Sequence, residues 1–117
     1  MKKMVLGITA LLLSCNLPPK YAATPAKVQL AQCLVDKGVM MYGAEWCGYC
    51  TKEKEAFGPE AWGVFKSNYV DCEASEENYR LCIGKNIQTF PSLEFKDGTI
   101  VTGYKSLGIL AKLSKCD

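Results

Sequence analysis

The chain has 117 residues, of which 49% are hydrophobic, and it carries 14 basic and 12 acidic side chains, seven cysteines and no histidine. This length suits one domain with a packed core. The absence of histidine excludes a His-activated nucleophile and most mixed zinc sites. Without Lys2 and Lys3 the basic and acidic counts are equal, which argues against nucleic acid or an anionic lipid surface as a partner. Many cysteines in a short chain indicate an oxidising compartment.

The first residues predict an export signal. Met1-Lys2-Lys3 is basic, and the apolar run that follows it, from Met4 to Leu13, is too short to span a bilayer. We therefore expect a signal peptide over residues 1–15 and an exported protein, either periplasmic or anchored to the membrane.

The signal is expected to end at a lipidation site. Leu12-Leu13-Ser14-Cys15 resembles a bacterial lipobox, in which the cysteine becomes the lipidated first residue. A lipid anchor at Cys15 is therefore expected, and ordinary cleavage within residues 21–26 is the alternative. Residues 16–26 hold three prolines and no periodic pattern, which predicts a tether before a folded domain over 27–117.

The rest of the chain predicts helices and strands from its apolar runs, its helical stripes and its turn residues. In chain order we expect a helix over 27–36, a strand over 39–42, a helix over 50–57, a further helical turn or two over 59–66, a strand over 69–71, a helix over 73–84, strands over 92–95 and 99–102, and a helix over 107–114.

The order of these elements predicts an α/β fold. Strands joined through helices favour parallel pairing, whereas Asp97-Gly98 suits a tight hairpin, whose strands are antiparallel. We expect a central mixed sheet of about four strands with helices on both faces. The residues expected to point inward from the helices are Val28, Leu30, Ala31 and Leu34, then Tyr79, Cys82 and Ile83, and finally Leu107, Leu110, Ala111 and Leu113.

Cys47 and Cys50 lie where a strand gives way to a helix. Residues three apart on a helix are close enough for a disulfide, and the helix N-terminus at Cys47 favours a thiolate, the attacking species in disulfide exchange. We assign Cys47 as the nucleophile and Cys50 as the resolving thiol. An inert bridge is one alternative. A zinc site with Cys72 and Cys82 is another, but their spacing of ten differs from the usual repeated spacing, so no metal and no cofactor is expected.

Four aromatic residues are considered as neighbours of this pair. Trp46, Tyr49, Phe90 and Tyr42 are candidates for an apolar rim that binds peptide substrates, although Tyr42 and Phe90 suit the core equally well. The charges of Glu45, Lys52 and Lys54 are expected to be solvated.

Two segments resemble a known fold. Ala44-Glu45-Trp46-Cys47-Gly48-Tyr49-Cys50 is similar to the active-site segment of thioredoxin, and Phe95-Lys96-Asp97-Gly98 resembles its hairpin. The resemblance implies a thioredoxin-like fold and a thiol–disulfide oxidoreductase activity.

A second set of motifs lies between Ala31 and the end of the chain. It consists of Tyr42-Gly43-Ala44-x-Trp46-Cys47-x-x-Cys50, Lys54-x-x-Phe57-Gly58, Tyr69-Val70-x-Cys72, Phe90-Pro91 and Ser106-Leu107-x-x-Leu110-Ala111. Together they resemble the thioredoxin-like domain fused to bacterial and plant vitamin K epoxide reductase homologues, which catalyse disulfide formation outside the cytoplasm. In that family a membrane part passes electrons from this domain to a quinone. The resemblance therefore implies protein substrates with thiols or disulfides, and a membrane quinone-linked disulfide oxidase as partner for a stand-alone relative.

The resemblance also implies which residues contact substrate. Pro91 is expected to follow a cis peptide bond and to face the dithiol, where the neighbouring backbone would pair with an extended substrate segment. The expected substrate-binding residues are Trp46, Gly48, Tyr49, Phe90 and Pro91.

Two positions depart from the thioredoxin pattern. Thioredoxin keeps a buried carboxylate six positions before its nucleophile, where this chain has Met41. It also keeps a proline before its second cysteine, where this chain has Tyr49, and Gly48-Tyr49 resembles the active site of the periplasmic disulfide isomerase. Deprotonation of Cys50 must therefore use another base or water.

The remaining cysteines are expected to form structural disulfides. A Cys72–Cys82 bond would close an 11-residue loop and stabilise by roughly 3 kcal/mol in the chain-entropy model, and the resembled family has a similarly placed second pair. A relay to the active dithiol is the alternative role. Cys33 and Cys116 are then left to tie the first helix to the C-terminus, on parity alone.

The sequence thus predicts an exported thiol–disulfide oxidoreductase that acts on protein thiols in oxidative folding. The alternatives are a periplasmic reductase that keeps exported thiols reduced, and a lipoprotein binding module whose cysteines are all structural.

Overall fold

The computed structural model describes residues 20–117. The expected signal peptide over 1–15, its lipidation site at Cys15 and residues 16–19 of the expected tether lie outside the described residues. In the part that is described, no helix has both the length and the apolar character needed to cross a membrane.

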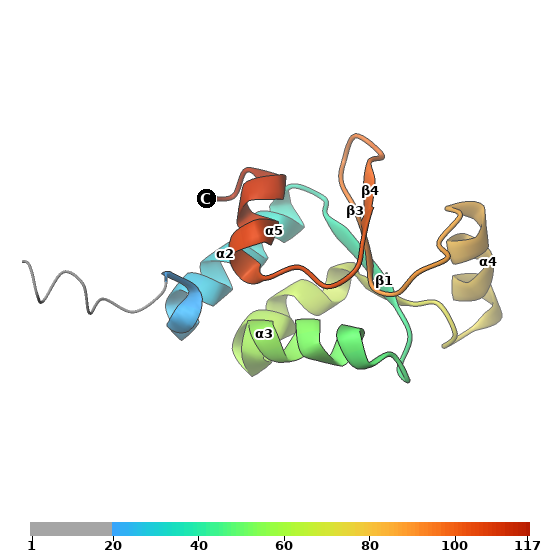
Figure 1. Cartoon of the computed structure of the whole chain (residues 1–117), viewed down its shortest axis with the longest axis horizontal. Helices are drawn as coiled ribbons and strands as arrows, with labels where there is room; N and C mark the ends of the chain where they lie inside the picture. Colours follow the sequence, from blue (N-terminus) through green and yellow to red (C-terminus); the bar gives the residue numbers. More distant parts are fainter. Residues whose placement is uncertain (1–19) are drawn as a thin grey trace, which may run out of the picture.

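Helices and strands follow one another in the expected order (Figure 1). The strands are β1 (Met40–Gly43), β2 (Tyr69–Asp71), β3 (Ser92–Glu94) and β4 (Ile100–Thr102). The helices are α2 (Thr24–Asp36), α3 (Gly48–Phe65), α4 (Glu76–Gly84) and α5 (Leu107–Ser114), with short 3-10 helices η1 (Lys20–Ala22) and η2 (Lys66–Asn68).

Helix α2 begins at Thr24, before the expected start at Lys27. Pro25 explains the earlier start. The N–H groups in the first turn of a helix have no hydrogen-bond partner within the helix, so proline, which lacks an N–H, fits there. The 3-10 helix η1 precedes α2, and the half-buried Tyr21 packs against the main core. Residues 20–26 are therefore part of the folded unit, and the expected tether over 16–26 is wrong for this stretch.

The span of α3 contains a kink at Gly58, where two helical segments meet, which confirms the break expected at Gly58 and Pro59. Gly58 has φ 81° and ψ 167°, a conformation that only glycine adopts readily, and Pro59 suits the first turn of the helical segment that follows. Because of this kink, aromatic rings in the second half of α3 pack against a ring in its first half. Phe57 stacks on Phe65 with ring centroids 5.2 Å apart, and Trp62 packs against both.

The sheet has the strand order β2-β1-β3-β4. β1 pairs with β2 in parallel, and the pairings of β1 with β3 and of β3 with β4 are antiparallel, which confirms the expected mixed α/β sheet. Because side chains alternate along a strand, the paired residues Met41 and Leu93 share one face, and Tyr42 and Ser92 share the other.

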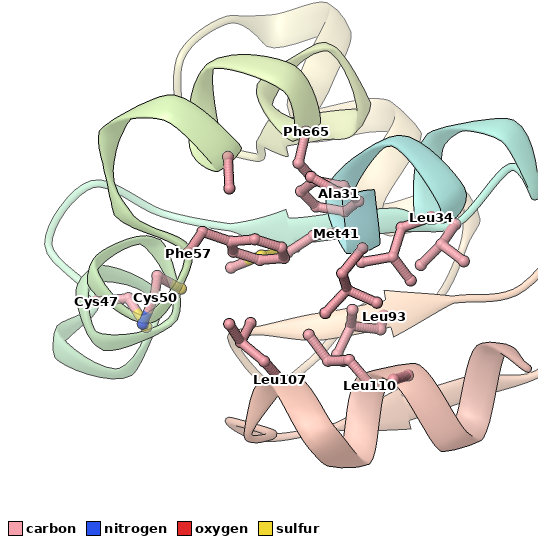
Figure 2. Close-up of a cluster of buried hydrophobic side chains, with 14 of the residues drawn as sticks. Ala31, Leu34, Met41, Cys47, Cys50, Phe57, Phe65, Leu93, Leu107 and Leu110 are labelled. Carbon is pink, nitrogen blue, oxygen red and sulfur yellow. The ribbon is translucent and has the colours of Figure 1, made fainter. Parts of the chain in front are cut away.

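The larger core lies on the face of Met41 and Leu93 (Figure 2). Three helices cover this face, and α2 packs against both α3 and α5. Figure 2 shows side chains that these helices direct toward the strands, among them Ala31 and Leu34 from α2, Phe57 and Phe65 from α3, and Leu107 and Leu110 from α5.

Two helices bury fewer apolar residues than expected. On α4 only Cys82 is buried, in a smaller cluster with Tyr42, while Tyr79 and Ile83 are exposed, because α4 approaches the sheet through its disulfide-bonded cysteine. On α5 the inner face is completed by Ser114, which lies four residues after Leu110 and donates a hydrogen bond to its carbonyl at 2.6 Å, whereas Leu113 is exposed.

Two disulfides link distant parts of the chain. Cys33 of α2 is bonded to Cys116, 83 residues later, and Cys72 is bonded to Cys82 of α4, ten residues later. Both are the pairs expected from the sequence. In the chain-entropy model the longer loop contributes about 4.5 kcal/mol and the shorter about 3 kcal/mol.

We predict that the Cys33→Ala/Cys116→Ala variant loses about 4 kcal/mol of unfolding free energy, more than the loss in Cys72→Ala/Cys82→Ala, because the longer loop restrains the unfolded chain more. Urea unfolding of both variants and the wild type, without reductant, measures the two losses. The ranking is wrong if the Cys72→Ala/Cys82→Ala variant proves to be the less stable one.

Candidate active site

The turn after β1 places two free thiols together. The Cys47 N–H donates to the carbonyl of Ala44 at 3.1 Å, and Cys47 then caps α3. The Cys47 sulfur accepts a hydrogen bond from the backbone N–H of Cys50 at 3.1 Å, and neither cysteine is in a disulfide. Figure 2 shows the two side chains side by side at the start of α3. A sulfur thus takes the place that a serine or aspartate oxygen usually occupies at a helix start, where partial positive charge stabilises a thiolate.

The two thiols differ in their surroundings. Cys47 retains 5% of its surface exposed, whereas Cys50 is fully buried. The pKa of the Cys50 thiol is raised to about 12, first by burial and then by the hydrogen bond with Cys47, while the Ala44 backbone and the Lys54 charge oppose this shift. The outer sulfur is therefore the one that a substrate can reach, and the inner sulfur holds its proton at neutral pH.

Aromatic side chains flank the outer sulfur. Trp46 is 70% exposed and Tyr49 is 63% exposed. The ring of Trp46 meets that of Phe90 edge-on, with centroids 5.9 Å apart, and its indole N–H donates to Glu73 at 2.8 Å. Tyr42, by contrast, is buried with its hydroxyl donating to Glu94, so it belongs to the core and not to a rim.

The segment before β3 lies beside this turn. The Trp46–Phe90 contact brings it there, the Phe90–Pro91 peptide bond is cis, and Pro91 is buried. The carbonyl of Pro91 accepts from the Gly103 N–H at 2.8 Å, which fixes the segment to the chain after β4. Gly48 is the exposed first residue of α3.

A buried carboxylate that sequence reasoning missed lies on α3. Glu53 is fully buried, one of its oxygens accepts the Lys105 N–H at 3.0 Å, and the other has no hydrogen-bond partner in the described part of the chain. Burial raises the pKa of Glu53 to about 7, against a smaller opposing effect of that hydrogen bond. Its spacing of three from Cys50 places both on one face of α3, which is the signal that could have identified it.

Lys54 is also placed differently from expectation. Its ammonium lies over the rings of Tyr69 and Trp62, 4.5 and 5.4 Å from their centroids, and is not simply solvated. The Tyr69 ring packs edge-on against Trp62 at 5.3 Å. Sequence reasoning gave Tyr69 no role beyond its strand, yet it lies beside the dithiol.

Gly43, the last residue of β1, leaves room for these groups. A Cβ atom at this position would lie 2.7 Å from the Cys50 sulfur, 2.8 Å from the Tyr69 hydroxyl oxygen and 3.0 Å from the Tyr69 ring. Distances this short are repulsive, so glycine is required where α3 and β2 meet the end of β1.

The Cys72–Cys82 disulfide lies next to this site, since the Cys72 N–H donates to the carbonyl of Gly43 at 2.8 Å. Cys72 and Cys82 are buried and bonded to each other, in the smaller core cluster. Their sulfurs are thereby occupied, which argues against the alternative zinc site. Among residues 20–117, no three histidine, cysteine or acidic side chains are grouped so as to hold a metal ion.

Comparison with known proteins places this chain beside a named oxidoreductase. No family model matches the chain. The chain is similar to the Arabidopsis thaliana protein named Thiol-disulfide oxidoreductase LTO1, with 32% identity over 98 residues, which are 80% of this chain and 25% of that protein. The chain thus spans about a quarter of the length of this relative. The relative's name and the cysteine pairs of this chain both fit a redox role.

We predict that Gly43→Ala lowers the unfolding free energy by about 1–3 kcal/mol and slows thiol–disulfide exchange, because the added methyl group displaces Cys50 or Tyr69. Urea unfolding and the rate of reaction with glutathione disulfide test both effects. Gly63→Ala is the matched control, since nothing lies within 4 Å of a Cβ at that exposed helical position, and it should be neutral or stabilising. Equal behaviour of the two variants would contradict the role of Gly43.

Glu53 predicts a pH dependence of stability. Because its pKa rises from 4.5 to about 7 on folding, its contribution is fully present below pH 4.5 and is lost as the pH rises through 7. Glu53→Gln abolishes this loss, so its stability relative to wild type should increase by about 2–3 kcal/mol between pH 4.5 and pH 8. Urea unfolding at both pH values measures the change, and a constant difference would show that Glu53 does not titrate in this range.

Proposed function

We propose that this chain is a thiol–disulfide oxidoreductase that exchanges disulfides with the thiols of protein substrates through Cys47 and Cys50. The observation that carries the proposal is the pair of free thiols at the start of α3, in which a backbone N–H donates to the sulfur of Cys47. The four other cysteines of the described chain are bonded in pairs, so this dithiol is set apart from the structural bridges.

The proposed cycle begins with a Cys47–Cys50 disulfide. A substrate thiolate attacks the Cys47 sulfur, the Cys47–Cys50 bond breaks, and its electron pair leaves on Cys50, which takes up a proton. A second substrate thiolate then attacks the substrate sulfur of the mixed disulfide and releases Cys47 as a thiolate, which accepts the Cys50 N–H. Two electrons pass from the substrate thiols to the enzyme, and the substrate gains a disulfide.

The rim around Cys47 supports a peptide substrate. Trp46 and Tyr49 are large, exposed and apolar over most of their surface, and Phe90 joins Trp46 from the segment before β3. In this proposal an extended substrate lies across these rings and pairs with the backbone beside Pro91, which brings its cysteine to Cys47.

The proposed setting is oxidative folding outside the cytoplasm. Two disulfides in a chain of this size support an oxidising compartment. The resemblance to the thioredoxin-like domain of vitamin K epoxide reductase homologues supports a membrane quinone-linked disulfide oxidase as the partner that reoxidises the dithiol. A lipid anchor at Cys15 would hold the domain near that partner.

We predict that Cys47→Ser abolishes the oxidation of a reduced peptide, whereas Cys50→Ser accumulates a mixed disulfide between Cys47 and the peptide, because the resolving thiol is gone. Mass spectrometry of acid-quenched, alkylated samples distinguishes the species. Cys72→Ala/Cys82→Ala is the control, and it should keep the exchange rate if this disulfide is a structural staple. Full activity of Cys47→Ser would refute the assigned roles.

The reduction potential of the Cys47–Cys50 pair tests the direction of the reaction. Equilibration in glutathione buffers should give a value near those of oxidants and isomerases, about −120 to −180 mV. A value near or below about −270 mV would favour the reductase alternative, and a pair that never titrates would favour the binding module.

A further inference from the structure

Tyr69 and Cys50 share one small space beneath the dithiol. The Cys50 sulfur lies 2.7 Å, and the Tyr69 hydroxyl oxygen 2.8 Å, from the point where a Cβ of residue 43 would stand. The strand register explains the meeting, since Tyr69 on β2 pairs with Met41 and so points to the same face as residue 43, two positions further along β1. Helix α3 brings Cys50 to the same point from its first turn.

Packing does not account for the hydroxyl group of Tyr69. Its oxygen is buried and has no hydrogen-bond partner within residues 20–117. A buried hydroxyl without a partner is unfavourable, and phenylalanine would fill the same volume without that penalty. The ring itself is well used, because it packs against Trp62 and beneath the ammonium of Lys54. The hydroxyl therefore needs an explanation separate from packing.

We infer that the Tyr69 hydroxyl donates a hydrogen bond to Cys50 when that sulfur is a thiolate, and that the positive charge of Lys54 strengthens this hydrogen bond. The inference rests on the proposed roles of Cys47 and Cys50. The Tyr69 hydroxyl thus provides a polar group beside the Cys50 sulfur, which Met41, at the position of the thioredoxin carboxylate, cannot provide.

The charges around Tyr69 and Cys50 favour a phenol that donates a hydrogen bond and not one that accepts a proton. Burial and the neighbouring Cys50 raise the pKa of the Tyr69 phenol, so it remains protonated at neutral pH. Lys54 lowers the pKa of Cys50, and its cation over the Tyr69 ring favours donation by the phenol O–H. The other ionisable groups that act on Tyr69 are Cys47, which caps α3, Glu45 in the turn and Asp71 on β2, and Glu53 follows Cys50 by three residues on α3.

The hydrogen bond acts at the moment when Cys50 is charged. When a substrate thiolate opens the Cys47–Cys50 disulfide, the electron pair leaves on Cys50, and the Tyr69 O–H donates to that sulfur without giving up its proton. In the reverse step the Cys50 thiolate attacks the Cys47 sulfur of a mixed disulfide, a Cys47–Cys50 bond forms, and the substrate leaves as a thiolate. Electrons balance in both directions, and water supplies the proton that Cys50 takes up after the first step and accepts it before the reverse step.

Tyr69→Phe tests the inference, because it keeps the ring and removes only the hydroxyl. Reduced protein is mixed with glutathione disulfide, quenched in acid, alkylated and analysed by mass spectrometry. The time courses give one rate constant for the attack of Cys47 on glutathione disulfide and a second for resolution by Cys50. A hydrogen bond to a charged acceptor raises the fraction of Cys50 present as thiolate about tenfold or more. A stabilised thiolate is also a weaker nucleophile, and this cancels about half of the gain in the resolution rate on a logarithmic scale.

We therefore expect resolution to slow at least about threefold in Tyr69→Phe, with the Cys47 step unchanged and the urea midpoint equal to or above that of wild type. The ratio of the two proteins' resolution rates should stay constant from pH 6 to 9, because the titration of Glu53 is common to both. The exposed Tyr79→Phe is the matched control and should leave both rate constants unchanged.

Two results would overturn the inference. Resolution at the wild-type rate in Tyr69→Phe would show that the hydroxyl does not assist Cys50. A lower urea midpoint with both rate constants reduced together would show that its role is structural. The proposed function fails separately, if wild-type protein forms no Cys47–Cys50 disulfide with glutathione disulfide or if Cys47→Ser reacts as fast as wild type.

Discussion

The close approach of α3 to the end of β1 is the constraint on which the site depends. Gly43 has no side chain, and the space that a Cβ would fill holds the sulfur of Cys50 and the hydroxyl of Tyr69. This approach buries Cys50 completely and leaves Cys47 at the rim, with its sulfur against the Cys50 N–H. The division between an accessible outer sulfur and a protected inner one therefore follows from the absence of a side chain at a single strand residue.

Burial at this site concentrates groups that the interior of a protein usually excludes. Cys50 and Glu53 lie on the inner face of α3, and burial raises the pKa of both side chains. Each of these buried groups has a stabilising contact nearby. The Lys105 N–H binds one oxygen of Glu53, and the ammonium of Lys54 lies near Cys50 and over Tyr69. Cys50 and Glu53 are thus supported by Lys54 of α3 itself and by the backbone N–H of Lys105, where the thioredoxin pattern uses one carboxylate at the position of Met41.

The sequence predicted the fold and the dithiol better than the groups around them. The order of helices and strands along the chain and the Cys-x-x-Cys position at a helix start follow from local patterns, namely apolar runs, helix formers and the Asp97-Gly98 turn. Glu53 had a signal in its spacing of three from Cys50, which the prediction did not use, whereas the role of Tyr69 depends on the register of β2 against β1, which no local pattern gives. Cysteine parity led to the Cys33–Cys116 pair. The early start of α2 had a signal in Pro25 that the prediction did not use, whereas the exposure of Tyr79 has no local signal.

The three cysteine pairs illustrate how position determines chemistry. Cys33–Cys116 closes a loop of most of the domain, so that the folded chain gains about 4.5 kcal/mol from it in the chain-entropy model. A Cys47–Cys50 bond would close only four residues and gain about 2 kcal/mol on the same basis, so chain entropy does little to hold it oxidised. Its stability is then decided by the groups that stabilise its thiolates in the reduced protein. At Cys47 that group is the N–H of Cys50, and at Cys50 the side chains that reach the buried sulfur belong to Tyr69 and Lys54.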